Sequence, residues 1–213
     1  MTEGTEGTVR ESTSISTQAE RSALSDQKMF EVAIDLVNER GTAKPTLKDI
    51  GEQAGYSRGL ASYRFGSKDG LWMELFARFD DLWKEHISSH LQDKRGLAAL
   101  TSAMEAQRDI FYRESGYLRA MYNLWYESLG RESDLRPRLA RHHVVYRRDV
   151  QQWVEEGQAA GDIKADVDAA HFATGYCSMM FGTIYQWVVA PDAIDIDAFF
   201  ARFAETTAWT ITD

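Results

Sequence analysis

Apolar residues recur along most of this chain at the spacing of one face of an α-helix. In the first such stretch, from about Ser25 to Arg40, Phe30, Ile34 and Val37 lie on one helical face, and Gly41 ends the pattern. Alternation of the strand type is not evident, and glycines and a proline separate the later helical stretches. Further long helices are predicted at residues 68–92, 97–114, 117–129, 134–160, 166–190 and 196–211. With two short helices between residues 46 and 65, the pattern predicts an all-α fold of about nine helices.

The two short helices are joined by a tight turn. Thr46 is expected to cap the first of them, with Asp49 completing a capping box. Gly55 supplies the positive φ that a sharp turn between helices needs, and Ser57 is expected to cap the second helix. Ser67 is expected to cap the long helix that follows. This is the pattern of a helix-turn-helix, whose second helix enters the major groove of DNA.

Charge distinguishes this segment from the rest of the chain. Residues 40–68 contain six basic and two acidic residues, a balance of +4, whereas the whole chain has a net charge of -9. A basic region in an acidic protein is typical of a surface that faces phosphate groups. The sequence therefore predicts that this segment binds double-stranded DNA.

Several residues of the two short helices are candidates for contacts with DNA. Arg58, near the start of the second helix, can form two hydrogen bonds with a guanine edge, or it can contact phosphate without reading sequence. Leu60 can touch a thymine methyl group. Thr46 and Lys48 lie at a helix N-terminus, where free N–H groups favour phosphate. The expected DNA-binding residues are Thr46, Lys48, Ser57, Arg58, Gly59, Leu60, Ser62, Tyr63, Arg64 and Lys68.

The same segment resembles the DNA-binding domain of the tetracycline repressor (TetR) family. Members typically show the run I-A-x-x-A-G-V-S-x-G-x-x-Y-x-x-F-x-x-K-x-x-L, and this chain has Ile50, Ala54-Gly55, Ser57, Gly59, Phe65, Lys68 and Leu71 in the matching places. It differs at Gly51, where the family usually has Ala, and at Ser62, where Tyr is common. The resemblance implies that Lys68 anchors the chain to a phosphate. It also implies a regulator whose C-terminal domain holds a pocket for a ligand that releases it from DNA.

A long uncharged stretch in the C-terminal half is nearly long enough to span a bilayer. Residues 169–191 contain no Asp, Glu, Lys or Arg, but they include many small and polar groups, and acidic rather than basic residues flank them. A buried interface between two subunits explains such a helix better. The preceding segment, Gly161–Asp168, resembles the lead-in of TetR-like regulators to two helices that pair with a second copy. The expected dimer-interface residues are Phe172, Tyr176, Met179, Met180, Thr183, Trp187, Phe199 and Phe203.

The central region is unusually rich in aromatic residues. For any one of them an ordinary place in the core is the alternative, but pockets between helices are mostly apolar with a few polar groups. A small hydrophobic effector is the expected ligand. The residues expected to contact it are Phe111, Arg113, Met121, Tyr122, Trp125, Tyr126, His143, Tyr146 and Phe172.

Other patterns of catalytic or metal-binding chemistry are weak. His86 and His90 lie four residues apart on one helical face, a spacing that can hold a metal ion, but the sequence identifies no third ligand. We therefore predict no metal site and no cofactor. Cys177, the single cysteine, lies in the apolar stretch, where packing explains it better than nucleophilic chemistry. One cysteine also excludes an intramolecular disulfide and suits the reducing cytoplasm.

These observations favour a homodimeric transcriptional regulator, rather than an enzyme, that binds a palindromic operator. The polar residues 1–21 are expected to form a disordered tail without a signal peptide. Residues 22–68 are expected to form the DNA-binding domain, and residues 69–213 the domain for ligand binding and dimerisation. The alternative is a helical-bundle enzyme or small-molecule carrier that uses the aromatic region and the histidines.

Overall fold

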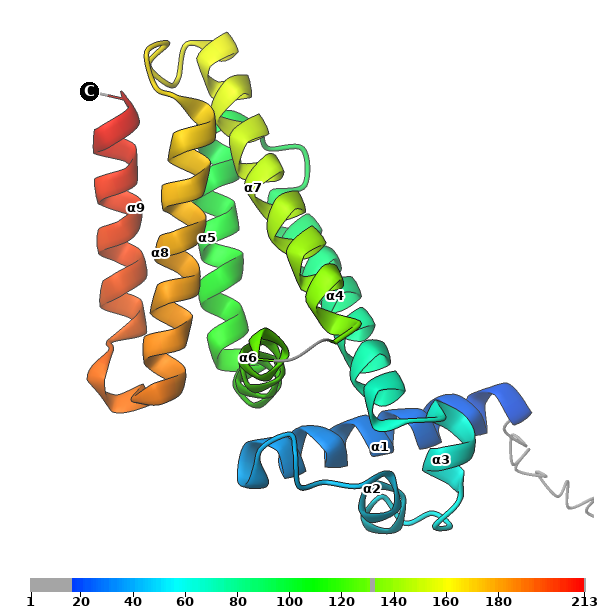
Figure 1. Ribbon diagram of the computed structural model, residues 1–213. Coiled ribbons are helices and arrows are strands. Elements are labelled where there is room, and N and C mark those ends of the chain that lie inside the picture. Colours follow the sequence, from blue (N-terminus) through cyan, green and yellow to red (C-terminus); the bar gives the residue numbers. More distant parts are fainter. Residues whose placement is uncertain (1–16, 131–132, 213) are drawn as a thin grey trace, which may run out of the picture.

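The computed structural model describes residues 17–130 and 133–212, and within them every regular element is a helix. This confirms the predicted all-α fold and the predicted number of helices. In chain order they are α1 (Gln18–Arg40), α2 (Leu47–Gln53), α3 (Leu60–Phe65), α4 (Lys68–Leu91), α5 (Gly96–Arg113), α6 (Ser115–Leu129), α7 (Leu135–Ala160), α8 (Ala169–Val189) and α9 (Ile196–Thr212), with a short 3-10 helix, Pro191–Ala193, before α9 (Figure 1).

The first helix begins earlier than the sequence pattern predicted. It starts at Gln18 rather than near Ser25, and Thr17 caps it: the Thr17 hydroxyl accepts a hydrogen bond from the Glu20 N–H, and the Glu20 carboxylate accepts one from the Thr17 N–H. The prediction of a disordered tail was therefore wrong for residues 18–21. Residues 1–16 of that predicted tail lie outside the described part of the chain.

The local geometry of the helix-turn-helix follows most of the predicted signals. Thr46 and Asp49 form the expected capping box at the start of α2, and Gly55 has a φ of +83° in the turn. The Ser67 hydroxyl caps α4 by accepting a hydrogen bond from the Gly70 N–H at 3.0 Å. The prediction for Ser57 was wrong. The second short helix, α3, starts two residues later, after Gly59, and no side chain caps it.

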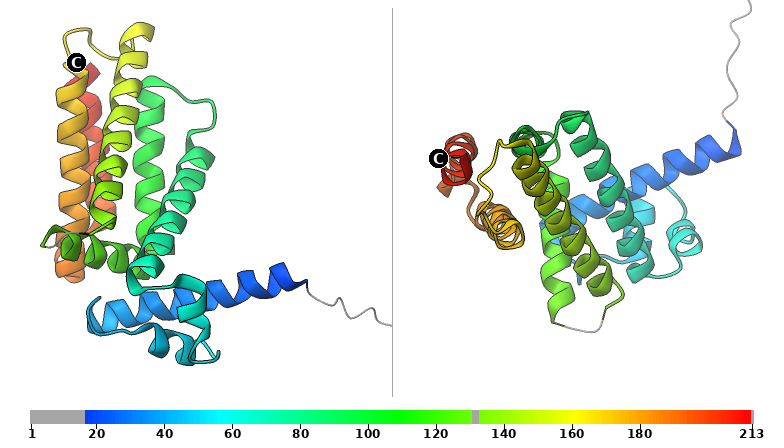
Figure 2. Two further views of the ribbon diagram at one scale, coloured as in Figure 1. Left: turned by 45° about the vertical axis from the view of Figure 1, so that its right-hand side comes forward. Right: turned by 90° about the horizontal axis from the view of Figure 1, so that it is seen from above.

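The helices form two regions joined by α4 (Figure 1). At one end α1, α2 and α3 pack together, and α4 runs from them into a bundle with α5, α7, α8 and α9. Helix α6 lies across the end of this bundle, where it packs against α1, as the views in Figure 2 also show. Helix α6 therefore contacts both regions.

Two hydrogen bonds reinforce the junction between the regions. The Asn38 side chain on α1 donates to the Gly116 carbonyl at the start of α6, at 2.9 Å. The Tyr117 hydroxyl on α6 donates to the Leu75 carbonyl in α4, at 2.7 Å, and this contact is buried. A continuous cluster of buried apolar side chains also extends from the helix-turn-helix into the bundle.

None of the helices in the described ranges combines the length and apolarity needed to cross a bilayer, and this includes α8.

Candidate DNA-binding surface and ligand cavity

The outer surface of the helix-turn-helix carries most of the residues expected to contact DNA. Lys48, Arg58 and Ser62 are exposed, as are Thr46, Ser57 and Gly59. Tyr63 on α3 is 89 % exposed. An aromatic ring held so far out of the core by a short helix is available to a partner, because its own chain gives it little contact. Leu60 is half-buried and contributes partly to the core.

Arg58 and Lys68 are accessible, although each has a contact within the chain. The Arg58 guanidinium pairs with the Glu52 carboxylate, and 75 % of the Arg58 side chain is exposed. Such an exposed ion pair is weak, so a phosphate or a guanine edge can replace it. The Lys68 ammonium donates to the Ala43 carbonyl at 2.8 Å, which ties the start of α4 to the loop before α2. An ammonium has three donors, so this bond leaves donors for a phosphate.

Arg64 does not fit the role expected from the sequence. Its Nε donates to Asp26 of α1 at 2.8 Å, and its two terminal nitrogens donate to the two oxygens of Glu74 of α4 at 3.0 and 2.9 Å. These carboxylates raise the pKa of Arg64 above its ordinary value. The guanidinium therefore braces α3 between α1 and α4, and we withdraw it from the expected DNA contacts.

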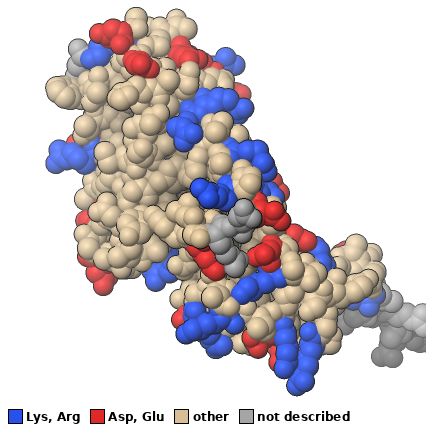
Figure 3. Space-filling model, in the orientation of Figure 1, with Lys and Arg blue, Asp and Glu red and all other residues tan. Residues whose placement is uncertain are grey.

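The basic side chains extend over this end of the molecule. In Figure 3, lysine and arginine side chains project from the lower end, where α1, α2 and α3 lie. Arg40, Lys44, Lys48 and Arg58 are all exposed. A duplex that approaches this end therefore meets positive charge even though the whole chain is acidic.

A second feature, a small cavity, lies within the bundle. Its volume is about 30 Å³, which is room for about two water molecules. Helices α4 to α8 all contribute to its wall, and the lining is mostly aromatic and aliphatic. The lining residues are Phe79, Trp83, Gln107, Ile110, Leu118, Tyr122, Trp125, His142, Tyr146, Met180, Phe181 and Ile184.

Three polar side chains in this wall have atoms without a hydrogen-bond partner among the described residues. They are both side-chain polar atoms of Gln107, the indole N–H of Trp125 and the hydroxyl of Tyr146, which has only the equally buried Tyr176 hydroxyl near it at longer range. By contrast, the Tyr122 hydroxyl donates to the Phe181 carbonyl at 3.3 Å. Unpaired buried polar atoms are uncommon and costly, so they mark where polar groups of a ligand or water can bind.

Burial shifts the pKa of three groups around the cavity in the direction that favours their neutral forms. It raises the pKa of the Tyr122 and Tyr146 hydroxyls well above the ordinary value. Burial, then the neighbouring His142 and Arg147, lower the pKa of His143 to about 4, so its ring is neutral at pH 7. That ring packs edge-on against Phe181, with centroids 4.4 Å apart. Among the described residues, no carboxylate, lysine or arginine lines the cavity.

The structure brings only some of the predicted ligand contacts to this cavity. Tyr122, Trp125 and Tyr146 line it, and His143 lies directly behind Phe181. The other five lie elsewhere: Met121 is in the core, Phe111 packs on Trp187 and Phe200, Arg113 pairs with Asp109 on the surface, Tyr126 packs on Tyr185, and Phe172 packs on Tyr176.

Sequence reasoning missed Gln107 and His142 as parts of this wall. A signal for Gln107 was present, because it occupies the buried face of α5 between Ala103 and Ile110, where an amide is out of place. His142 had no such signal. Its Nδ1 lies 3.0 Å from a carboxylate oxygen of Asp80, on a different helix.

The predicted dimer interface also needs correction. Tyr176, Met180 and Thr183 are buried against their own chain, so they cannot lie on the outer face of α8. Met179 is exposed, and Phe172, Trp187, Phe199 and Phe203 are half-buried. The outer face of α8 instead carries Gly175, Met179, Gly182, Tyr185 and Val189.

Two family models match the chain. Residues 30–75 match the model described as "Bacterial regulatory proteins, tetR family", and residues 120–203 match "Tetracyclin repressor-like, C-terminal domain". The first contains the helix-turn-helix, and the second contains most of the cavity wall. No curated protein sequence gives a significant match.

Solved structures share the fold at low sequence identity. A regulator from Saccharomonospora viridis, solved in complex with choline, is 19% identical with a TM-score of 0.79, covering 90% of this chain and 99% of that one. A TetR-family regulator from Rhodococcus sp. is 18% identical, with a TM-score of 0.70 and coverage of 90% and 100%. NalD of Pseudomonas aeruginosa, the secondary repressor of the MexAB-OprM efflux pump, is 17% identical, with a TM-score of 0.70 and coverage of 91% and 98%. Both domain models and the shared fold lead to one conclusion: the chain belongs to the TetR family of bacterial transcriptional regulators.

Proposed function

We propose that this protein is a homodimeric repressor that binds a palindromic DNA operator through α3 and is released by a small, largely apolar ligand. The proposal keeps the domain division expected from the sequence, with DNA binding in residues 22–68 and ligand binding and dimerisation in residues 69–213. The observation that carries it is the outer surface of the helix-turn-helix. There Arg58 and Tyr63 are highly exposed on or beside a short helix that is braced from behind by Arg64.

The cavity supports a ligand-dependent release. Phe79 and Trp83 in its wall belong to α4, the helix that begins at Lys68 beside the DNA-binding surface. The cavity is much smaller than a typical ligand site, so a ligand has to move its walls, α4 included. The two α3 helices of a dimer have to be spaced to match the two operator half-sites. Release from DNA follows if the ligand binds more tightly to a position of α4 in which this spacing no longer matches.

The wall also indicates the kind of ligand. Its unpaired atoms are chiefly N–H and O–H donors, with the Gln107 carbonyl as an acceptor. A neutral, ring-containing molecule with one or two carbonyl or hydroxyl oxygens suits this arrangement.

Dimerisation is supported by the apolar outer surface of the last two helices. Met179 and Val189 on α8 are 50 % and 65 % exposed, and Trp209 on α9 is 68 % exposed. Large apolar side chains left exposed on a folded chain are typical of an interface. Two copies joined there present two α3 helices, which suits half-sites about one helical turn of DNA apart or a multiple of it.

The test is selection of bound duplexes from a random DNA pool at near-physiological salt. We expect an enriched palindrome for the wild-type protein. In Arg58→Ala, specificity should relax at one base position of each half-site, by about 1–3 kcal/mol, because a bidentate contact to guanine is lost. The control is Arg148→Ala, which removes the same charge from an exposed site on α7 and should leave the motif unchanged.

One result would contradict this proposal, and another would contradict only the base contact assigned to Arg58. If no motif is enriched, the surface does not read DNA sequence, and a small-molecule carrier that uses the cavity becomes the better explanation. If a motif is enriched and Arg58→Ala leaves every position unchanged, Arg58 contacts only phosphate or nothing.

A further inference from the structure

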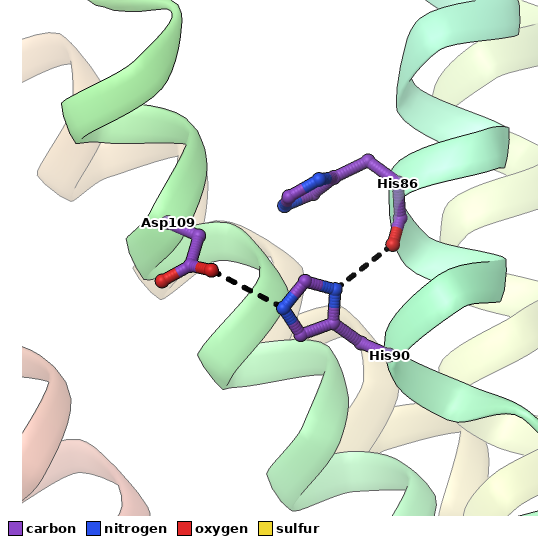
Figure 4. A group of neighbouring side chains, drawn as sticks. All are labelled: His86, His90 and Asp109. Carbon is purple, nitrogen blue, oxygen red and sulfur yellow. Dashed lines mark hydrogen bonds and ion pairs between the residues drawn. The ribbon is translucent and has the colours of Figure 1, made fainter.

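A cluster of two histidines and one aspartate joins the end of α4 to α5. His86 and His90 project from α4, and Asp109 faces them from α5, as Figure 4 shows. The candidate ligand atoms of the three side chains all lie within 4.8 Å of one another. All three residues are half-buried, and the two imidazole centroids are 4.6 Å apart. The structure thus supplies the third ligand that the sequence spacing of the two histidines lacked.

The hydrogen bonds of His90 fix which of its nitrogens can bind an ion. Its Nδ1 lies 3.0 Å from the backbone carbonyl oxygen of His86, and a carbonyl oxygen can only accept a hydrogen bond. Nδ1 therefore carries the proton in the neutral ring, and Nε2 has a free lone pair. That Nε2 lies 3.3 Å from Asp109 Oδ2, so either the proton of an imidazolium ring or a bound cation has to lie between this nitrogen and the carboxylate.

The same arrangement is the usual support of a metal-binding histidine. Such a ring donates its second N–H to a backbone carbonyl, which holds the ring in place and increases the basicity of the ligating nitrogen. His86 is anchored similarly, because its Nε2 lies 2.8 Å from the Ala106 carbonyl of α5. Arg113 approaches Asp109 at 3.8 Å and neutralises part of its charge, but 69% of the Arg113 side chain is exposed, so it can move aside.

We propose that His86, His90 and Asp109 bind one divalent transition-metal ion of the zinc, cobalt or nickel class. Two imidazole nitrogens and one carboxylate oxygen suit these ions, whereas magnesium and calcium prefer oxygen ligands alone. Tetrahedral zinc at about 2.0–2.1 Å from each ligand requires ligand atoms about 3.3 Å apart, so modest side-chain rotations complete the site. Water or an external ligand would fill the fourth position.

An ion can reach this cluster from the surface. A surface groove reaches His86, and two glutamates in its wall place carboxylates on the approach of a cation. The groove is lined by Leu82, Glu85, His86, Ser89, Ile110, Arg113 and Glu114. Once bound, the ion would join α4 to α5 near the end of α4 that is distant from the helix-turn-helix. A link of this kind stabilises the folded state in proportion to ion concentration and affinity.

The test is calorimetric titration of the tag-free, chelator-treated full chain with ZnCl₂ at pH 7. We expect one ion per chain at roughly micromolar concentrations and a rise in thermal midpoint with zinc. His90→Gln and Asp109→Asn should each weaken binding by about tenfold or more and abolish that rise. His171→Gln, which changes an exposed histidine on α8, is the control and should bind zinc as the wild type does. Circular dichroism of each variant establishes that it folds.

Nitrogen NMR of the histidine rings gives a second, independent readout. Zinc should shift the Nε2 resonance of His90 and leave its Nδ1 protonated. If His90 is instead a charged imidazolium paired with Asp109, zinc at equal concentration leaves its ring resonances unchanged and the titration shows no single site. Binding that survives both substitutions would also overturn the proposal. Neither readout involves DNA, so the result is separate from that of the operator experiment.

Discussion

Gln107 is deeply buried and its side chain has no hydrogen-bond partner in the described part of the chain. Substituting it therefore tests whether the cavity has an unsatisfied polar group that a ligand can bind. It is 2 % exposed, and neither of its side-chain polar atoms is hydrogen-bonded to a described residue. A buried amide without partners costs about 1–3 kcal/mol. We therefore expect Gln107→Leu, which keeps a similar size, to raise the free energy of unfolding of the ligand-free protein by about 1–3 kcal/mol. Urea denaturation followed by tryptophan fluorescence measures this change.

Gln158 provides a matched control for that substitution. Its amide donates to the carbonyls of Lys164 and Val167 at 3.0 and 2.8 Å, so both bonds are lost in Gln158→Leu. That variant should be less stable than the wild type, the opposite sign to Gln107→Leu. If both substitutions destabilise the protein equally, Gln107 is satisfied in solution, and the cavity is not held open for a ligand at this position.

The role of a residue could not be predicted from the sequence where that role depends on a partner far away along the chain. Arg64 looked like a DNA contact because it is basic and lies in the recognition segment, but its partners are Asp26 and Glu74, 38 and 10 residues away. Asp109 is 19 residues from His90, and nothing in the sequence around Asp109 distinguishes it from the other acidic residues of the chain. Composition and spacing indicate which chemistry is available, whereas packing decides which groups meet.

At the scale of the helices, the pattern predicted most boundaries because amphipathic faces and caps are local. The start of α1 was missed for a physical reason. Residues 17–24 are all exposed, so that part of the helix has no buried stripe, and only the Thr17 capping box marks its start. Helix α8 posed the opposite problem. It is apolar on most sides, so its pattern could not show which face packs on its own chain.

The glycines of α8 predict where a second copy approaches. Gly175 and Gly182 lie two turns apart on the outer face, and a Cβ at either position would meet nothing in this chain. Each costs about 1 kcal/mol relative to alanine in a helix, so close contact with a partner helix explains them better than internal packing. We expect Gly182→Arg to convert the dimer into a folded monomer, measured by light scattering after size-exclusion chromatography.

The control for that variant is Gln152→Arg, which adds the same side chain at an exposed site on α7. It should leave the dimer intact, while circular dichroism shows both variants to be helical. A wild-type protein that runs as a monomer, or a Gly182→Arg dimer as tight as the wild type, would place the interface elsewhere or remove it.

At the scale of the whole molecule, the separation of charge decides how the protein finds DNA. The chain has a net charge of -9, whereas residues 40–68 of the helix-turn-helix have a balance of +4, and lysine and arginine side chains project from the end that carries α1 to α3 (Figure 3). A uniformly basic protein would bind along any DNA in many orientations. Here the excess of negative charge lies outside the helix-turn-helix, so approach by the helix-turn-helix is favoured over approach by the rest of the chain.

This separation predicts that the position of a lysine, rather than the total charge, controls the salt dependence of binding. Lys48→Ala and Lys84→Ala change the net charge equally, but Lys48 lies at the start of α2 and Lys84 lies on α4, within the bundle. If Lys48 contacts one phosphate in each subunit, its loss should flatten the slope of log affinity against log salt by about 1 per subunit. Lys84→Ala should leave that slope unchanged.

Fluorescence anisotropy with the selected operator, measured over a range of salt concentrations, gives both slopes. Equal flattening in the two variants would mean that net charge alone drives the association and that the basic end is not the contact surface.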